Sequence, residues 1–318
     1  MKIALLEPLG VKNELIEELS APIKAQGHTF VYYDQKTTDI EELKKRSAGC
    51  DIVMIANNPY PAEVVNACPD LKYLNVAFTG IDHVGLEACK NNGVMVSNAA
   101  NYSNQTVAEL VIGMTIALLR RMPEGDAATR SGGTSAGLRG KEIGGRTVGI
   151  IGTGRIGMIT AKLFLAFGAK VIATDICENE EAKRLGIEYV SLETLMSRSD
   201  IISLHTPNTA STRSLINRDM IRLMQPHAIF INCARGPIVD NAALAEALNE
   251  GVLAGAAIDV FDMEPPIPAD YPLLHAKNII LTPHVAFLSD ESMIRRAEIV
   301  FKNLECYLAG NPQNVCKL

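Results

Sequence analysis

The sequence predicts an α/β protein built from two doubly wound parallel sheets, and three observations support this class. Short apolar runs alternate with amphipathic helical patterns through residues 2–98. Such alternation is typical of parallel strands joined by crossover helices. A stretch rich in Gly, Ser, Thr and Ala interrupts the pattern at 122–145, and a second alternating series follows it. The chain therefore contains two such sheets.

The first series predicts five strands separated by four helices. The expected strands are 2–8, 29–34, 51–57, 71–77 and 94–98, and the expected helices are 13–26, 39–49, 61–68 and 86–93. A long amphipathic helix is expected next, over 103–122. Its run "LVIGMTIALL" is only about half a membrane span and follows Glu109 directly, so we expect this helix to be buried in the protein. The segment 122–145 lacks a hydrophobic period and is expected to be a loop or arm.

The second series predicts strands at "RTVGII", "KVIATD", "DIISLH", "AIFINC", "AGAAIDV" and "NIILTP". The last helical pattern, 290–310, comes after this series is complete, so we expect it to pack on the first sheet. The predicted domains are therefore 1–98 plus 287–318, which is discontinuous, and 99–286, which is inserted in it.

Composition limits the classes of partner. With 318 residues, 47% of them hydrophobic, and a formal charge of −6, the chain offers no basic face for nucleic acid or acidic lipid. Its seven cysteines are scattered and none forms a C-x-x-C pair, which predicts reduced thiols and a cytoplasmic protein. The start "MKIALLEPLG" resembles a first strand rather than a signal peptide. No cluster of residues suggests a metal site.

The segment "IIGTGRIG" is the strongest cofactor signal. Gly152 allows a tight turn, Gly154 lets the backbone approach a pyrophosphate, and Gly157 lets helix and strand pack closely. The next strand ends at Asp175, where a carboxylate can bind both ribose hydroxyls of NAD. The alternative interpretation of this segment is a Gly-rich helix start with a capping Asp and no cofactor site. The combination predicts a Rossmann domain that binds NAD rather than NADP.

Three polar residues follow apolar strands of the second series: Arg235, Glu264 and His284. The carboxyl ends of parallel strands share one edge of a sheet, so we expect them to lie near the nicotinamide. Reduction of a keto acid needs a cation for the carboxylate and carbonyl, a proton donor, and a partner that keeps the donor charged. A structural ion pair, a solvated turn residue and a hydrogen-bonded histidine are the respective alternatives.

The motifs "GTGRIG", "HTPNTASTRSLIN", "INCARGPIVD", "GAAIDVFDMEP" and "TPHVAF" together resemble the D-isomer-specific 2-hydroxyacid dehydrogenases over nearly the whole chain. The resemblance implies a flavodoxin-like substrate domain around the Rossmann domain. It also implies that Arg235 binds the substrate carboxylate and polarises its carbonyl, that His284 is the general acid and base, and that Glu264 pairs with His284.

The resemblance also implies further contacts. A substrate loop would receive the carboxylate on backbone N–H groups at Phe78, Thr79 and Gly80, unless this is an ordinary strand-to-helix turn. Asn98, Tyr102 and Thr106 would line the cleft, with helix capping and core packing as alternatives. Asp259 would hold the nicotinamide amide, or cap a buried turn. The remaining cofactor contacts implied are Arg155, Ile156, His205, Thr206, Pro207, Thr212, Cys233 and Ala234.

The expected function is an NAD-dependent D-2-hydroxyacid dehydrogenase that reduces hydroxypyruvate, glyoxylate or another small 2-keto acid. D-3-phosphoglycerate dehydrogenase is an alternative, disfavoured because Val76 and Phe78 stand where many relatives carry Arg and Gly. A non-catalytic, NAD-sensing corepressor is the alternative from another class. The segment 122–145 resembles the family's dimerisation segment, which implies a homodimer, although its common tryptophan is absent here.

Overall fold

The computed structural model describes residues 1–263 and 266–318. It divides into two compact units. The discontinuous unit comprises Met1–Ser103 and Leu288–Leu318, and the inserted unit comprises Asn104–Phe287. The sequence placed the corresponding boundaries after residues 98 and 286.

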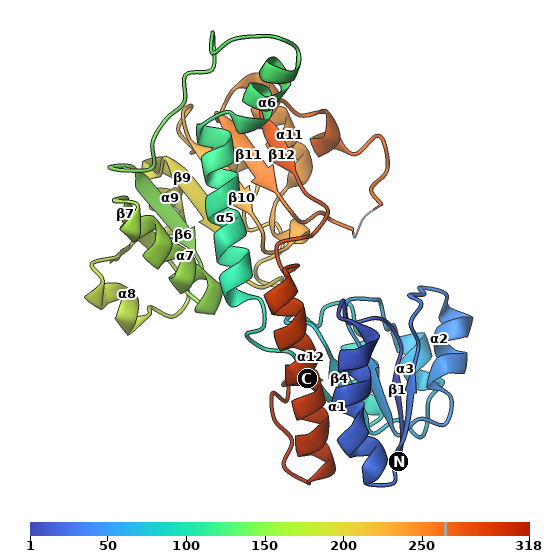
Figure 1. Ribbon diagram of the computed structural model, residues 1–318. Coiled ribbons are helices and arrows are strands. Elements are labelled where there is room, and N and C mark those ends of the chain that lie inside the picture. Colours follow the sequence, from blue (N-terminus) through green and yellow to red (C-terminus); the bar gives the residue numbers. More distant parts are fainter. Residues whose placement is uncertain (264–265) are drawn as a thin grey trace. The chain divides into compact units, whose positions relative to one another are not determined.

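The discontinuous unit contains a five-stranded parallel sheet (Figure 1). The strand order β2-β1-β3-β4-β5 is that of flavodoxin-like folds. Buried β-branched and aliphatic side chains dominate its central strands, because helices cover both faces. The strands are β1 Lys2–Leu5, β2 Thr29–Tyr32, β3 Ile52–Ile55, β4 Tyr73–Val76 and β5 Met95–Asn98.

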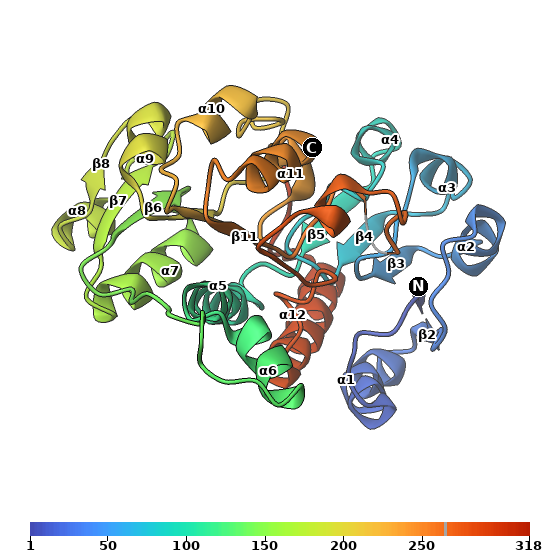
Figure 2. The same cartoon turned by 90° about the horizontal axis from the view of Figure 1, so that it is seen from above.

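Figure 2 shows α1 and α12 on one face of this sheet and α2, α3 and α4 on the other. The helices are α1 Asn13–Ala25, α2 Ile40–Ser47, α3 Ala62–Asn66, α4 Leu86–Asn91 and α12 Asp290–Leu308. Helix α12 begins with a capping box in which Ser289 and Ser292 exchange hydrogen bonds.

Buried amides attach α12 to the sheet. Asn75, on β4, donates from Nδ2 to the Val300 carbonyl at 2.7 Å. Asn303, on α12, donates to the Asn98 carbonyl at 3.0 Å and accepts from Asn314 Nδ2 at 2.8 Å. Since Asn75 and Asn303 are both fully buried, these bonds satisfy amides that would otherwise be costly to bury.

The inserted unit contains a seven-stranded parallel sheet in the order β12-β11-β10-β9-β6-β7-β8. Counted from β6, this is the Rossmann order with one further strand at the edge. The predicted fold class, a Rossmann domain inserted in a flavodoxin-like domain, is confirmed. The strands are β6 Thr147–Ile151, β7 Lys170–Thr174, β8 Glu188–Tyr189, β9 Ile201–Leu204, β10 Ile229–Asn232, β11 Gly255–Ile258 and β12 Ile279–Leu281.

Two apolar cores lie on opposite faces of this sheet. Helices α5 Asn104–Leu119 and α7 Arg155–Ala166 pack on one face, with Val111 and Phe164 fully buried. The other core includes Leu195, Ile221 and Leu244. These come from α9 Leu192–Arg198, α10 Arg218–Arg222 and α11 Asn241–Glu250. The remaining elements are α8 Glu180–Arg184 and the short 3-10 helices η1 Gly236–Ile238 and η2 Pro272–His275.

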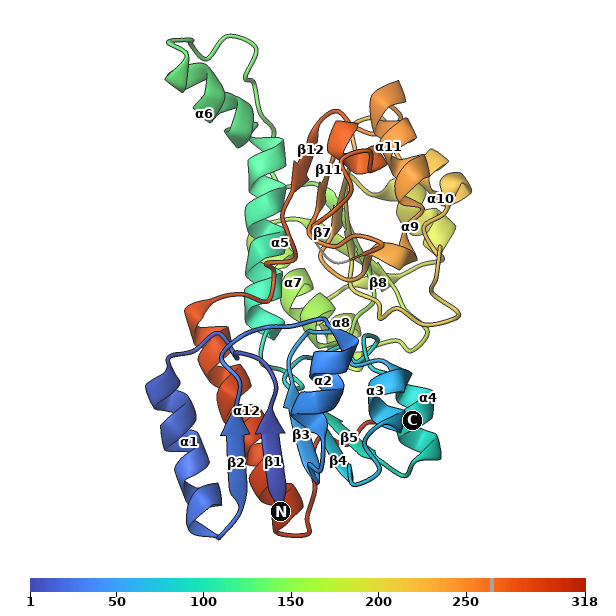
Figure 3. The same ribbon diagram turned by 90° about the vertical axis from the view of Figure 1, so that its right-hand side faces the viewer.

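The segment predicted to be an arm without secondary structure begins with a helix, so that prediction was wrong for its first part. Helix α6 spans Met122–Arg130 and has no buried residue. It is separated from α5 by Arg121, whose φ of +53° ends the preceding helix. Figure 3 shows α6 standing off the end of α5. The nine residues of α6 include Pro123 and Gly125, which have low helix propensity, and only one large apolar side chain, Met122, so the sequence did not reveal the helix.

No helix in the described parts of the chain combines the length and apolarity needed to cross a bilayer. All seven cysteines carry free thiols, and four of them are buried.

Candidate active site

Six neighbouring strands of the inserted unit end on a single row of paired residues. The row consists of Thr174, Ile151, Leu204, Asn232, Ile258 and Leu281. Among the described residues, several predicted sites lie shortly after members of this row: Asp175, the glycine turn, His205, Arg235, Asp259 and His284. Adjacent strands are about 4.8 Å apart, so the ends of β10 and β12 are separated by roughly 10 Å.

The glycine turn after β6 has the geometry that a pyrophosphate site requires. Gly152 has a φ of +96°, and a Cβ there would lie 2.9 Å from the His205 carbonyl. At Gly157 a Cβ would collide with the Gly152 carbonyl oxygen. At Gly154, the N-cap of α7, a Cβ would meet open space, so the backbone is accessible. Arg155 and Ile156 open α7 beside this accessible backbone.

Asp175 is held at the end of β7 by two backbone N–H groups and one hydroxyl. Its Oδ2 accepts from Thr153 N at 2.5 Å and from Thr153 Oγ1 at 3.1 Å. Its Oδ1 accepts from Cys177 N at 3.1 Å. The carboxylate is half-buried, while the next residue, Ile176, is fully exposed. A carboxylate fixed in this way is suited to accept the hydroxyls of a ribose.

The loop after β9 supplies a neutral histidine and a buried hydroxyl. Desolvation lowers the pKa of His205 to about 3, and Ser203 Oγ lies 2.8 Å from its Nε2. Thr206 Oγ1 is buried, and the described residues contain no hydrogen-bond partner for it. Its methyl group lies close to Gly152. A polar cofactor bound beside the glycine turn would satisfy this hydroxyl, so the site fits a dinucleotide.

The same loop is closed by its own hydroxyls. Thr212 Oγ1 donates to the Pro207 carbonyl at 2.6 Å and accepts from Thr209 N at 2.8 Å.

The loop that carries Arg235 is shaped by the buried Asn232, which sequence reasoning did not single out. Asn232 Nδ2 donates to the Arg235 carbonyl at 3.0 Å, and its Oδ1 accepts from Ala234 N at 2.9 Å. Arg235 Nη1 donates to the Ala234 carbonyl at 2.7 Å. At Gly236 a Cβ would collide with the Phe261 carbonyl. A polar residue at the end of an otherwise apolar strand was the available signal for Asn232.

Cys233 belongs to the core rather than to the chemistry of this loop. Its Sγ lies 3.8 Å from Met114 Sδ, and burial raises the pKa of its thiol well above the ordinary value. The thiol therefore stays protonated at neutral pH and is a poor nucleophile.

His284 lies in a strained turn after β12. Its φ is +56°, a conformation that non-glycine residues rarely adopt. Its backbone N donates to the Asp259 carbonyl at 2.8 Å, and its ring packs edge-to-face on Phe287 at 5.3 Å between centroids. Such strain persists only where surrounding bonds enforce it, and it is concentrated at functional sites.

Asp259, which directly follows β11, accepts most of the hydrogen bonds that hold this turn. Its fully buried carboxylate accepts from Thr282 Oγ1 at 2.5 Å and Val285 N at 2.8 Å on one oxygen, and from Ala286 N at 2.8 Å on the other. Burial raises its pKa despite these hydrogen bonds. The carboxylate thus binds residues on both sides of His284.

Two further predicted site residues remain. Glu264 lies outside the described residues, and Thr106 lies in the first turn of α5.

In the discontinuous unit, the predicted substrate loop follows β4. Ala99 N donates to the Phe78 carbonyl at 3.0 Å, and Asn98 Nδ2 donates to the Thr79 carbonyl at 2.7 Å. Asn98 therefore holds the backbone of the loop, a role that its sequence position alone did not specify. Gly80 follows directly and is partly exposed.

Aromatic side chains support this loop from within the unit. Phe78 is buried, with its ring 6.1 Å from the rings of both His83 and Tyr102. Tyr102 is also buried, and its carbonyl accepts from Arg295 Nε at 3.0 Å.

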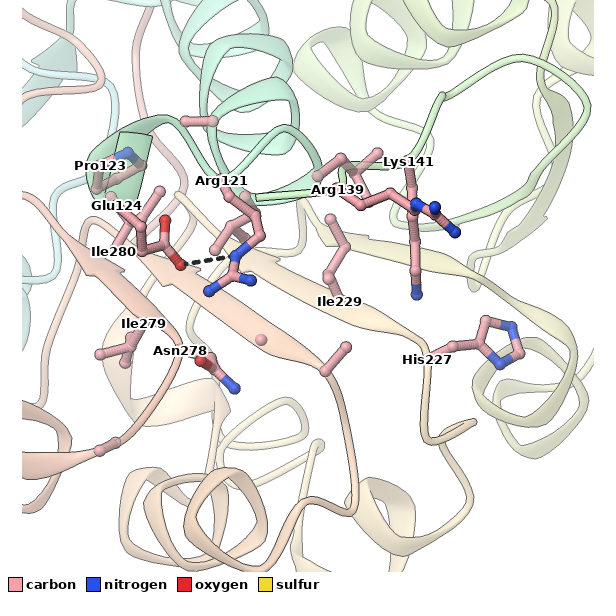
Figure 4. A pocket seen from close by; sticks show the side chains of 16 residues that line it. Arg121, Pro123, Glu124, Arg139, Lys141, His227, Ile229, Asn278, Ile279 and Ile280 are labelled. Atoms are coloured by element: carbon pink, nitrogen blue, oxygen red, sulfur yellow. Dashed lines mark hydrogen bonds and ion pairs between the residues drawn. The ribbon is translucent and has the colours of Figure 1, made fainter. Parts of the chain in front are cut away.

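A separate hollow of about 540 Å³ lies at the opposite edge of the seven-stranded sheet, beside the start of α6. Its apolar wall includes Ile229 and Ile279, near the beginnings of β10 and β12. Figure 4 shows Arg139 and Lys141 among the side chains around it, and the ion pair between Arg121 and Glu124. None of the predicted site residues in the described parts of the chain lines this hollow.

The family model described as "D-isomer specific 2-hydroxyacid dehydrogenase, NAD binding domain" matches residues 112–286, more than half of the chain. The chain belongs to this family. It is an NAD-dependent 2-hydroxyacid oxidoreductase, and the glycine turn and Asp175 lie within the matched NAD-binding domain.

Curated relatives of this dehydrogenase carry several substrate names. A glyoxylate reductase of Thermofilum pendens is 37% identical over 85% of this chain and 82% of its own. A hydroxypyruvate reductase of Blautia hydrogenotrophica is 35% identical over 92% and 93% of the two chains. A D-3-phosphoglycerate dehydrogenase of Methanocaldococcus jannaschii is 37% identical, and the match covers 85% of this chain but 52% of that protein.

Solved structures of the family share the whole architecture. A D-lactate dehydrogenase of Aquifex aeolicus, complexed with NAD and lactic acid, has a TM-score of 0.85 and 29% identity over 98% of this chain and 96% of its own.

Proposed function

We propose that this dehydrogenase reduces a small 2-oxo acid, glyoxylate or hydroxypyruvate, and that Arg235, Glu264 and His284 perform the reaction. The observation that carries the proposal is the common row of strand ends from which the loops of Arg235, Asp259 and His284 emerge. The names of the Thermofilum and Blautia relatives support the choice of substrates. The NAD motif lies on the same row.

Arg235 would bind the substrate carboxylate and polarise the carbonyl oxygen. A guanidinium suits both tasks because its planar fork matches a carboxylate and it keeps its proton at every physiological pH. In the proposed binding mode, N–H groups at Phe78, Thr79 and Gly80 also receive the carboxylate. Their backbone is already ordered by Asn98 and Ala99, which lowers the entropic cost of binding.

His284 would move the proton. In reduction, its imidazolium gives a proton to the carbonyl oxygen as C2 accepts a hydride, which forms the 2-hydroxy acid. In oxidation, the neutral ring takes the hydroxyl proton. NAD supplies or accepts the hydride when bound. Asp259 would act as a positioning residue, since its bonds to Val285 N and Ala286 N hold the backbone that follows His284.

Glu264 would keep His284 protonated, because a neighbouring carboxylate favours the imidazolium. Glu264→Gln removes that charge and should lower the pKa that limits reduction, so the pH profile of keto-acid reduction shifts to lower pH. Steady-state kcat/KM from pH 5 to 9 measures the shift. Glu291→Gln, at an exposed position in α12, is the matched control. An unchanged profile in Glu264→Gln would remove Glu264 from this role.

The substrate class is tested by NADH oxidation with glyoxylate, hydroxypyruvate, phosphohydroxypyruvate, pyruvate, 2-ketoisocaproate and phenylpyruvate, with His284→Ala in parallel. Turnover of glyoxylate or hydroxypyruvate that the variant loses by about a thousandfold supports the proposal, since general acid–base catalysis contributes up to about 10⁴-fold. Preference for phosphohydroxypyruvate would favour phosphoglycerate chemistry. Tight NADH binding without turnover of any acid would favour an NAD-sensing protein.

We also propose that two copies of the chain form a homodimer through α6 and the hollow beside it. Helix α6 has no buried residue, and nine residues are too few for a stable isolated helix in water. A second copy would bury it. Light scattering should give twice the chain mass for the native protein and a smaller mass for Ala127→Glu, an exposed site on α6. A native mass of one chain would contradict the proposal.

We also propose that the protein is cytoplasmic, and its seven free thiols support this location.

A further inference from the structure

The segment that follows α12 runs along the outer side of the five-stranded sheet. Strand β5 is the last in the strand order, with β4 on one side of it. The segment 311–318 lies along its other side, where Ser97 and Val315 form an antiparallel bridge and Cys316 N donates to the Val96 carbonyl at 2.8 Å. These bonds satisfy backbone groups that an edge strand otherwise leaves unpaired.

Asn314 fixes this segment to the last residue of β5, Asn98. The Asn314 carbonyl accepts from Asn98 N at 3.1 Å, and Asn314 Nδ2 donates to Asn303 Oδ1 at 2.8 Å. Asn303, which is fully buried on α12, donates in turn to the Asn98 carbonyl at 3.0 Å. Both backbone groups of Asn98 are therefore held by bonds that lead to Asn314. The φ of Asn314 is +52°, a conformation that Asn adopts more readily than most residues.

Asn98 and Ala99 hold the predicted substrate loop. Asn98 Nδ2 donates to the Thr79 carbonyl at 2.7 Å, and Ala99 N donates to the Phe78 carbonyl at 3.0 Å. In a planar trans peptide unit, a carbonyl and the N–H of the next residue point in opposite directions. Each of these two bonds therefore turns the following N–H away from Asn98 and Ala99. The N–H groups fixed in this way belong to Thr79 and Gly80, two of the three that would receive the substrate carboxylate.

The direction of these N–H groups affects how tightly an anion binds. A hydrogen bond weakens steeply when its donor turns away from the acceptor. A donor that is already fixed also loses less conformational entropy on binding than a mobile one. Any residue that keeps Asn98 in place therefore contributes to substrate affinity without touching the substrate.

We propose that Asn314 is a positioning residue for the substrate, because it acts through Asn98 to orient the N–H groups of Thr79 and Gly80. This inference rests on the proposed function and adds a support for its substrate loop from a distant part of the sequence. The connecting hydrogen bonds are 2.7 to 3.1 Å long and lie within the discontinuous unit. The glycine turn of the cofactor site belongs to the inserted unit. A change at Asn314 should therefore weaken substrate binding and leave NADH binding intact.

A purely structural role of the segment 311–318 has a different signature. If Asn314 only stabilised the fold, its replacement would lower Tm and the fraction of active enzyme. The molecules that stay folded would then bind the substrate as before, and KM would not change. KM therefore separates the two roles, whereas Tm and total activity do not.

The test uses two replacements of Asn314 with different side effects. Asn314→Asp keeps the shape of the side chain but turns an acceptor towards Asn303 Oδ1. Asn314→Gly removes the side chain and tolerates the positive φ, so it covers the case in which the aspartate variant does not fold. Asn311→Asp and Asn311→Gly are the matched controls, at an exposed position in the same segment. Steady-state kinetics with glyoxylate and hydroxypyruvate gives KM and kcat, and fluorescence titration gives the Kd of NADH.

We expect both Asn314 variants to raise KM for the 2-oxo acid about fivefold, the effect of one lost hydrogen bond. The kcat and the Kd of NADH should change less than twofold, because the groups that act on the reacting atoms and on the cofactor are unaltered. The Asn311 variants should change none of these values by more than twofold.

A double-mutant cycle tests whether Asn98 carries the effect. Asn98→Ala removes the bond to the Thr79 carbonyl, so it should also raise KM. Adding Asn314→Gly to Asn98→Ala should raise KM by a smaller factor than Asn314→Gly does alone, because the two residues act along one path. If the two factors multiply instead, Asn314 does not act through Asn98 and the inference is wrong.

The inference is also overturned if KM stays within twofold of the native value in the Asn314 variants while Tm falls, or if NADH binding weakens as much as substrate binding. Failure of the native protein to reduce any 2-oxo acid would instead refute the proposed function, and this inference with it. The two failures are therefore distinguishable.

Discussion

Replacing Asp259 by Asn tests whether one buried carboxylate builds the His284 turn. The carboxylate accepts three hydrogen bonds, from Thr282 Oγ1, Val285 N and Ala286 N. An amide has one oxygen, so its NH2 group must face at least one of these donors. A lost charge-assisted hydrogen bond and an unsatisfied buried N–H together cost about 2–3 kcal/mol. In a unit of this size that loss lowers Tm by roughly 5–10 °C.

Differential scanning calorimetry measures this loss directly, and Asp219→Asn is the matched control. Asp219 is exposed in α10, where the same chemical change should cost less than about 0.5 kcal/mol. Keto-acid reduction by Asp259→Asn should also fall, with NADH binding less affected, because the His284 turn loses its support. If the Tm of Asp259→Asn stays within about 1 °C of the native value, the carboxylate does not hold the turn, and the strain at His284 has another cause.

Three further outcomes are expected. The pKa of His205 is about 3 in the folded protein and near 6.5 in the unfolded chain. Between pH 6.5 and 3 the unfolded chain binds a proton on His205 and the folded protein does not, so the stability of the fold decreases as the pH falls through this range. His205→Asn should flatten the fall of Tm from pH 6.5 to 4; an identical slope would contradict the argument. Asp175→Ala should raise the KM for NADH at least about tenfold and reduce the preference of the enzyme for NADH over NADPH. Steady-state kinetics with both cofactors measures this, and an unchanged cofactor preference would exclude a contact between Asp175 and the ribose. Gly236→Ala places a Cβ against the Phe261 carbonyl and should lower kcat. NADH binding, measured by fluorescence titration, should not weaken. Full activity of the variant would show that the turn at Gly236 can move to accommodate the Cβ.

Much of the fold follows from patterns that are local in sequence. Each strand is a short apolar run bounded by turn residues, and the glycine turn requires only neighbouring positions. The common sheet edge of the loops that carry Arg235 and His284 was also predictable, because it depends on strand direction alone, whereas Glu264, expected beside them, lies outside the described residues. The structure adds the register that aligns Asn232, Ile258 and Leu281 in one row.

The rest depends on contacts that no local pattern encodes. Helix α6 has no buried residue and contains Pro123 and Gly125, so neither apolar content nor helix propensity indicated it. The three bonds to Asp259 join residues 23 to 27 positions apart.

The attachment of α12 to β4 has a consequence for biosynthesis. Asn75 and Asn303 are 228 positions apart, and the whole inserted unit is translated between them. While the ribosome makes residues 104–287, the five-stranded sheet has all its strands and α1 but lacks α12, so the part of that face over β4 stays open. The inserted unit can fold during that interval, since domains generally fold as units as they emerge. A stop codon within residues 290–303 removes most of α12, so the truncated chain should be prone to aggregation although both sheets are complete.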